Sequence, residues 1–261
     1  MKKEILSVRE RRRYSRQIML PEIGLKGQEK LKGANVLVVG AGGLGCPVLQ
    51  YLSAAGIGKI SIVDFDMVDE TNLSRQVLYG SSDLGKLKSI IAKSRLEELN
   101  PFTEYKIINR RIDDSNALKF LGDYDVVVDA TDNIETRYVL NDACVFLNKP
   151  MVHGSVFKYE GMISVFNYKG GVSYRDFNPD SLQKHFRNPA PANVGFFGTL
   201  PGLVGSWMAN EVIKIITESG VVLSGKMLVI NIYNNTINTF SLKKEPVETI
   251  INEVTPTLAT V

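Results

Sequence analysis

Cysteine is scarce in this sequence: its 261 residues contain only Cys46 and Cys144. The two lie far apart, each within a helical pattern, so the sequence excludes a disulfide framework and a zinc site made of cysteines. Such sparing use fits a reducing compartment. Histidine is equally scarce. His153 lies in an apolar strand pattern and is interpreted as a satisfied core residue, and His185 as an exposed one.

Long apolar runs and a strong charge of one sign are also missing. No run approaches the ~20 residues of a membrane-spanning helix, so we expect no membrane association. The basic start "MKKEILSVRERRRYSRQ" lacks the apolar segment of a secretory signal. A formal net charge of +3 is too small to indicate a nucleic-acid partner. We therefore expect a cytoplasmic protein that binds no nucleic acid.

The first 150 residues alternate between strand and helix patterns. Four strand patterns and three helical patterns follow one another, at 34–40, 43–55, 59–66, 85–100, 104–112, 125–131 and 135–148. The pattern at 125–131 is apolar throughout, which is typical of a strand buried on both faces. This alternation predicts an α/β fold with a mostly parallel sheet and right-handed crossovers.

The second part of the chain has a different pattern. Strand patterns at 150–157 and 161–167 are joined by a link too short for a helical crossover, which indicates an antiparallel or mixed extension of the sheet. The polar stretch 175–193 has no clear periodicity and is expected to be a long functional or mobile loop. A helix at 200–217 and a hairpin around Asn234-Asn235 complete the expected elements.

The stretch "VLVVGAGGLGCPVLQYL" is a strand, a glycine turn and a helix, with G-x-G-x-x-G spacing at Gly40, Gly42 and Gly45. The free backbone N–H groups of the helix suit a phosphate. Asp64 ends the next strand, where an acidic residue typically accepts hydrogen bonds from ribose hydroxyls. The motif indicates a nucleotide without saying which one.

The residues from 63 to 88 favour a nucleotide triphosphate over a nicotinamide cofactor. Arg75 and Lys88 can neutralise phosphate charge, and Asn72 and Gln76 can orient oxygens through neutral hydrogen bonds. A hydride carrier has no γ-phosphate that would need such a set.

Two further polar residues, Asp132 and Asn133, follow the strand at 125–131. Ligands of open α/β sheets bind at such strand ends. A carboxylate beside a polyphosphate is a candidate ligand of Mg²⁺, so Asp132 is the predicted magnesium ligand. Asp66 is interpreted either as a turn cap or as a catalytic group.

Several segments in this order resemble the ThiF/MoeB/HesA family, relatives of the ubiquitin-activating enzymes. They are "RYSRQIMLPEIGLKGQEKL", "VLVVGAGGLGCPVLQYLSAAGIGKISIVDFDMVDETNLSRQ", "DLGKLK", "LEELNP", "VVVDATDN" and "GLVGSWMANEVIKII". The resemblance covers about residues 13–244. It implies a Rossmann-like mixed sheet, a homodimer, and MgATP-dependent adenylation of the C-terminal glycine of a ubiquitin-like sulfur carrier ending in Gly-Gly. The carrier would serve thiamine or molybdopterin biosynthesis.

The resemblance also implies roles for individual residues. Catalytic roles fall to Arg16, Arg75, Lys88 and Asp132. The nucleotide would be held by Gly40, Gly42, Gly43, Asp64, Asp66, Asn72, Arg75, Gln76, Lys88, Asp132 and Asn133. Arg16 corresponds to an arginine that reaches the ATP of the other subunit. The expected division of one adenylation domain is a helical arm at 1–30, a nucleotide-binding half at 31–149, a carrier-binding and sheet-extension half at 150–244, and a tail at 245–261.

The sequence departs from the family at its cysteines. Many members hold a structural zinc with two C-x-x-C pairs, whereas Ser173 and Asp176 stand at the places of the first pair and no cysteine follows Cys144. We therefore expect no zinc. The loop at 175–193 also lacks the cysteine that some members link to the carrier. Cys46 opens a helix whose dipole could lower its thiol pKa, but it is interpreted as structural.

Three other functions remain open. Within the family, the substrate could be a peptide or a tRNA-bound carboxylate, and the weak positive charge disfavours tRNA. Outside it, the chain could be a nicotinamide-dependent oxidoreductase, or a catalytically inactive scaffold for a ubiquitin-like partner. The combined acidic and basic residues at 64–88 disfavour both of these.

Overall fold

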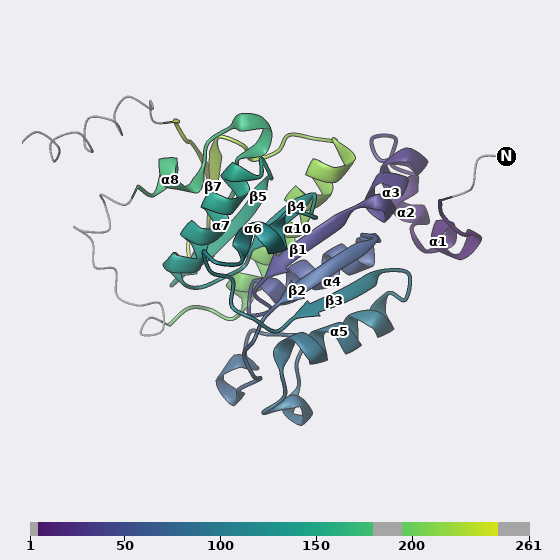
Figure 1. The fold of residues 1–261 in the computed structure, drawn as a ribbon, viewed down its shortest axis with the longest axis horizontal. Coiled ribbons are helices and arrows are strands. Elements are labelled where there is room, and N and C mark those ends of the chain that lie inside the picture. The colour runs from purple at the N-terminus through teal and green to yellow at the C-terminus, as the bar shows by residue number, and fades with distance from the viewer. Residues whose placement is uncertain (1–4, 180–194, 245–261) are drawn as a thin grey trace, which may run out of the picture.

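The computed structural model describes residues 5–179 and 195–244, and its centre is one sheet of eight strands (Figure 1). The spatial order of the strands is β3-β2-β1-β4-β5-β6-β7-β8. Their bounds are Asn35–Val39 (β1), Lys59–Val63 (β2), Glu104–Ile108 (β3), Val126–Asp129 (β4), Met151–Phe157 (β5), Glu160–Phe166 (β6), Lys226–Asn231 (β7) and Thr236–Ser241 (β8).

The first five strands of the chain pair in parallel. β1 lies between β2 and β4, and its last residue, Val39, is level with Val63 of β2 and Asp129 of β4. The carboxyl ends of these three strands therefore meet at one edge of the sheet. All four residues of β4 are buried, as its apolar pattern predicts.

The remaining strands extend the sheet in antiparallel fashion. β5 pairs with β6, β6 with β7 and β7 with β8. The turn from β5 to β6 is tight, and Lys158 there has a φ of 53°. β8 forms the edge, with all six of its residues exposed. The α/β class and the mostly parallel sheet with an antiparallel C-terminal extension are both confirmed.

Helices cover both faces of the sheet because β1 and β4 place alternate apolar residues on each side. Val36 and Val38 belong to one apolar cluster, with α4, α5 and α10, and Leu37 and Val39 to a second, with α6 and α7. The α-helices are Val8–Arg13 (α1), Ser15–Ile18 (α2), Gly24–Gly33 (α3), Gly45–Ala55 (α4), Lys88–Leu99 (α5), Ala117–Leu121 (α6), Ile134–Phe146 (α7), Tyr174–Phe177 (α8) and Thr199–Thr217 (α10).

Several expected elements differ at their ends: the strand expected at 59–66, for example, ends at Val63. The helix expected from residue 85 begins at Lys88, because residues 85–87 pair with the segment after β2. β3 ends at Ile108 instead of residue 112. The stretch expected to be a loop from residue 175 begins inside α8, and its residues 180–193, with His185, lie outside the described residues. Within residues 5–179 and 195–244, no helix has the length and apolar character to cross a membrane.

Candidate functional site: the edge where parallel strands end

The glycine turn after β1 has room only for glycine at two positions. Gly40 has a φ of 96°, and a Cβ there would lie 2.6 Å from the carbonyl oxygen of Ala130, just after β4. A Cβ on Gly45 would lie 1.9 Å from the carbonyl oxygen of Gly40. The backbone of the turn therefore packs directly against neighbouring backbone. The glycines have no side chains to cover the N-terminus of α4, where the sheet's parallel strands end.

Ala41, in the middle of the turn, is held on both sides of its backbone. Its N–H donates to Oδ2 of Asp64 at 2.7 Å, and its carbonyl accepts from the Tyr79 hydroxyl at 2.8 Å. The other oxygen of Asp64 accepts from the backbone N–H of Asp66 at 2.9 Å. Burial raises the pKa of Asp64 above its usual range. Each carboxylate oxygen keeps one acceptor position, as a ribose-binding group requires.

Lys88 reaches the same edge through a short bridge between two chain segments. The N–H of Val68 donates to the carbonyl of Lys86, and the N–H of Lys88 donates to the carbonyl of Asp66. The Lys88 side chain is buried, and its Nζ lies 3.0 Å from Oδ2 of the more exposed Asp66. The structure thus brings together two predicted site residues that are far apart in sequence.

Arg75 and Gln76 lie beside the glycine turn, on the segment that follows the short helix η1 (Glu70–Asn72). Gln76 is 4% exposed, and its Oε1 is buried without a hydrogen-bond partner within the described residues. A Cβ on Gly42 would lie 3.6 Å from Nε2 of Gln76. A buried amide with an unused oxygen next to a bare glycine leaves a place for a ligand donor group.

The start of α10 borders this place. The guanidinium of Arg75 lies 5.3 Å from the ring centre of Phe196, and its Nη1 donates to the carbonyl of Thr71 at 2.7 Å. A Cβ on Gly43 would lie 3.2 Å from Cβ of Pro201. Arg75 is thus oriented by its own loop and by the residues that lead into α10.

The turn after β4 carries the last two predicted residues. Asp132 is exposed. Asn133 caps α7, where its side-chain oxygen accepts from the N–H of Thr136 at 2.9 Å. Its amide N–H₂ is the part of the side chain that remains to meet a ligand.

Arg16 is the predicted site residue that lies apart. It lines a hollow of about 430 Å³ with residues that include Tyr51 of α4 and Asn210 of α10. Tyr51 lies toward the C-terminal end of α4, whereas the glycine turn lies at its N-terminus, and an 11-residue helix is about 16 Å long. Figure 1 shows α1–α3 on the side of the molecule opposite the loops between β2 and α5.

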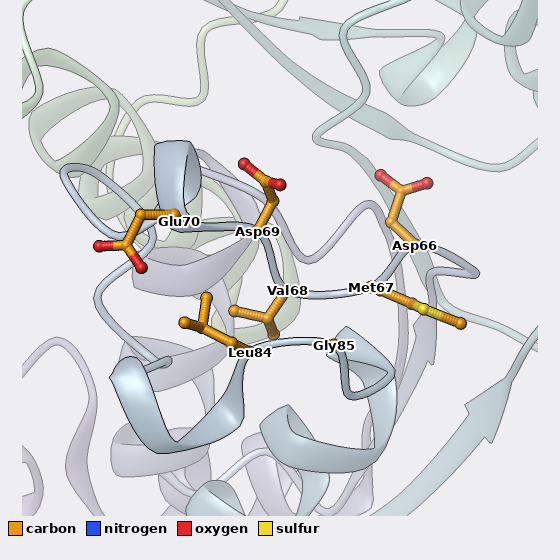
Figure 2. A pocket seen from close by; sticks show the side chains of 7 residues that line it. All are labelled: Asp66, Met67, Val68, Asp69, Glu70, Leu84 and Gly85. Carbon is orange, nitrogen blue, oxygen red and sulfur yellow. The ribbon is translucent and has the colours of Figure 1, made fainter.

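A second hollow, of about 620 Å³, lies beside Asp66 and is drawn in Figure 2. Asp66, Asp69 and Glu70 line it, but their carboxylates point apart rather than toward one point. Across residues 5–179 and 195–244, no three His, Cys, Asp or Glu side chains come together as a metal site would require. A magnesium ion here would need oxygens from a bound phosphate.

Both cysteines are buried free thiols. Burial raises the pKa of the Cys46 thiol to about 12, and it also raises that of Cys144. The helix dipole therefore does not activate Cys46, since its Sγ lies inside the core and faces the carbonyl of Ala41 at 3.4 Å. The structural interpretation of both cysteines is supported.

Sequence reasoning missed two supports of the site. Tyr79 holds the glycine turn, and Asp129 binds the turn after β4 through Thr131 at 2.6 Å. An aspartate in an otherwise apolar strand was the available signal for the second support. No pattern in the sequence marked Tyr79, because its partner is a backbone carbonyl 38 residues away.

Ser173 and Asp176, which stand at the places where the resemblance leads us to expect a cysteine pair, cap a helix in this chain. Ser173 and Asp176 form a capping box on α8, with the Ser173 N–H donating to the Asp176 carboxylate at 2.7 Å. The Arg175 guanidinium makes two hydrogen bonds of 2.6 Å to the Asp142 carboxylate on α7.

Comparison with known proteins finds similar chains and a matching family model. The family model described as "ThiF family" matches residues 14–249. A probable molybdopterin-synthase adenylyltransferase of Porphyra purpurea is 44% identical over 236 residues, 90% of this chain and 62% of that protein. The sulfur carrier protein adenylyltransferase of Thermus thermophilus is 43% identical over 239 residues, 90% of this chain and 88% of that protein.

Among solved structures, that of E. coli MccB with ATP has a TM-score of 0.78 and 27% identity, covering 90% of this chain and 73% of that chain. This chain spans less than two thirds of the Porphyra relative's length.

Proposed function

Since this chain belongs to the ThiF family, we propose that it is an ATP-dependent adenylyltransferase acting on a ubiquitin-like sulfur carrier protein. It activates the carrier's C-terminal glycine as an acyl-adenylate and releases pyrophosphate. The carrier then delivers sulfur in thiamine or molybdopterin biosynthesis. The observation that carries the proposal is the meeting of Asp64, Gln76 and Lys88 around one glycine turn.

The residues at the turn fit ATP in both shape and charge. Asp64 has acceptor positions for ribose hydroxyls, and the buried Oε1 of Gln76 is available for a ligand donor group. Lys88 and Arg75 supply positive charge, with Asn72 on the same loop. Gly40, Gly42 and Gly43 contribute no side chains to the turn.

The exposed Asp132 fits a magnesium ion that also binds phosphate oxygens, since Mg²⁺ in such sites usually has one or two protein carboxylates. When bound, this ion would neutralise phosphate charge. No zinc is part of the proposal.

The chemistry of adenylation follows from charge. The carrier's carboxylate attacks the α-phosphorus of ATP, a new P–O bond forms, and the bond to pyrophosphate breaks. Because an anion attacks an anion, the barrier falls when fixed cations neutralise the phosphate oxygens. Arg75 and Lys88 perform this task, and orientation of the carboxylate supplies much of the remaining acceleration. No side-chain nucleophile takes part, which suits a chain whose thiols are buried.

The active enzyme in this proposal is a homodimer. Arg16 is exposed, makes no ion pair within the described residues, and lies at the far end of α4 from its own glycine turn. It would serve the site of the partner subunit. Residues 31–149 hold the nucleotide, residues 150–244 receive a carrier ending in Gly-Gly, and the location is cytoplasmic.

The proposal is tested by exchange of labelled pyrophosphate into ATP. We expect exchange only when a carrier ending in Gly-Gly is added, and none with the carrier lacking its last glycine. Arg75→Ala should abolish exchange. The matched control is Arg95→Ala, which removes an arginine that pairs with Asp83 at 3.3 Å instead of facing the turn.

The cysteine variant Cys46→Ala/Cys144→Ala should keep exchange, because adenylation needs no thiol. A wild-type protein that shows no carrier-dependent exchange with any Gly-Gly carrier would overturn the proposed function. Loss of exchange in a folded double cysteine variant would overturn the thiol-free mechanism.

A further inference from the structure

An aspartate and a histidine form a hydrogen-bonded pair buried in the core, behind the turn that follows β4. Asp129 is the last residue of β4, and His153 is its register neighbour on β5. Their side chains are 0% and 2% exposed, and Nδ1 of His153 lies 2.7 Å from Oδ2 of Asp129. Neither residue touches the site directly, so the proposed reaction does not account for them.

Stability does not explain this pair. Removing a carboxylate from water costs several kcal/mol, and apolar residues of the same volume often replace a buried pair without loss. The neighbouring positions of β4, Val126–Val128, are all apolar. An aspartate at this place therefore points to a geometric task.

The other oxygen of Asp129 shows the task. Its Oδ1 accepts from the hydroxyl of Thr131 at 2.6 Å and from the N–H of Thr131 at 3.1 Å. The carbonyl of Thr131 accepts from Nη2 of Arg137 at 3.0 Å. Thr131 is thus held at three atoms, and Asp132 is the next residue.

His153 in turn holds Asp129. Its ring packs against the rings of Tyr174 and Phe166, at 5.2 Å and 5.8 Å from centre to centre. Burial lowers the pKa of His153, so the ring is neutral and its Nδ1–H donates to Asp129. Burial also acts to raise the pKa of Asp129, but the His153 hydrogen bond brings it below the usual range.

We propose that His153 is a positioning residue for the reaction: it fixes Asp129, which fixes Thr131 and so aims Asp132 at the phosphates. This inference rests on the proposed function for the role of Asp132. The arrangement of His153, Asp129 and Thr131 does not depend on that function.

The test compares three variants of the full chain in carrier-dependent pyrophosphate exchange. His153→Leu keeps the side-chain volume and removes the hydrogen-bond donor. We expect kcat to fall about 10- to 100-fold, the usual cost of losing a residue that orients a ligand group, while KM for ATP changes much less. His153→Asn places an amide N–H₂ where Nδ1 was and should restore most of kcat. Leu121→Val disturbs the same apolar cluster from α6 instead of from a ring that packs on His153, and it should leave kcat unchanged.

A second measurement separates this inference from the proposed function. Amide hydrogen exchange of residues 130–136 should be faster in His153→Leu than in wild type, and unchanged in Leu121→Val. If the wild-type enzyme adenylates no carrier, the proposed function fails, and hydrogen exchange still decides whether His153 positions the turn.

Three results would overturn the inference. The first is equal loss of kcat in His153→Leu and Leu121→Val, and the second is unchanged kcat and unchanged turn exchange in His153→Leu. Should His153→Leu fail to fold, Thr131→Val removes the hydroxyl donor at the other end of Asp129, and the same kcat loss and faster turn exchange are expected. Their absence in Thr131→Val is the third result.

Discussion

The two halves of the sheet use their strands in opposite ways. In the parallel half, β4 is entirely buried, and the polar residues Asp64 and Asp132 follow strand ends that meet at one edge. In the antiparallel extension, β8 is entirely exposed, and the rings of Tyr233 and Phe240 lie open on the surface. The first half concentrates polar groups at one place, and the second leaves several large apolar side chains exposed.

This contrast follows from strand direction. Parallel strands begin at one edge of a sheet and end at the other, so the segments that leave them gather together. Antiparallel strands run in alternate directions, so the turns between them, with their polar groups, are divided between the two ends of the strands. A nucleotide site that needs convergent donors therefore belongs to the parallel half.

The largest expected effect concerns the two residues assigned to one composite site. Arg16→Ala and Asp132→Ala should each lower pyrophosphate exchange about 100-fold or more, the usual cost of removing a charge-stabilising group. Mixing the two inactive proteins should return roughly a quarter of wild-type activity. About half of the dimers are then mixed, and each mixed dimer has one site with both residues intact.

Arg12→Ala is the matched control, since Arg12 lies exposed on the same arm. Its exchange should stay at the wild-type rate. If mixed dimers are confirmed by mass and activity stays at the level of the single variants, Arg16 does not act across a dimer.

A second expected effect contrasts two helical glycines, one at the start of α4 beside the glycine turn and one in α10. A Cβ on Gly45 would lie 1.9 Å from the carbonyl oxygen of Gly40, whereas a Cβ on Gly202 in α10 meets nothing within 4 Å. Gly45→Ala should destabilise the fold by about 2–3 kcal/mol, as overpacking does. Gly202→Ala should be neutral or stabilise by up to ~1 kcal/mol, because alanine favours a helix. Urea unfolding followed by circular dichroism measures both.

The sequence predicts those features of the candidate site that depend on local patterns. The glycine spacing, Asp64 at a strand end and the apolar run 125–131 each depend on neighbours in sequence, and each is where it was expected. The family resemblance is confirmed as well. The bridge that brings Lys88 to Asp66 and the bond from Tyr79 to Ala41 depend on pairings 22 and 38 residues apart. No local periodicity reports such pairings.

The buried histidine gives an expected pH effect of intermediate size. Burial lowers the pKa of His153 below its ordinary value of 6.5. Below pH 6.5 the unfolded chain therefore binds a proton that the folded chain refuses, and stability falls with pH toward the lowered folded pKa. Wild type should lose stability between pH 7.5 and 5.5, measured by urea midpoints. His153→Asn should lose less over the same interval.

The lowered pKa of Asp129 also makes stability decrease as the pH falls. This loss of stability occurs at more acidic pH, below the ordinary carboxyl value of 3.8. Equal pH slopes in wild type and His153→Asn between pH 7.5 and 5.5 would contradict the assignment of a neutral, buried His153.

The smallest expected effect concerns the contact between α7 and α8, the short helix that contains Ser173 as its cap and no cysteine. Here Arg175 joins α8 to Asp142 on α7 through two bonds of 2.6 Å, and its guanidinium lies 4.6 Å from the ring centre of Tyr138. Both charged side chains are 40–47% exposed, so water screens them. Asp142→Ala should therefore destabilise the fold by only about 0.5–1 kcal/mol, the range of a well-formed surface pair.

Elemental analysis should find no stoichiometric zinc, and a chelator should leave the urea midpoint of wild type unchanged. A chelator-induced shift, or one zinc per chain, would mean that a metal and not this ion pair holds α8.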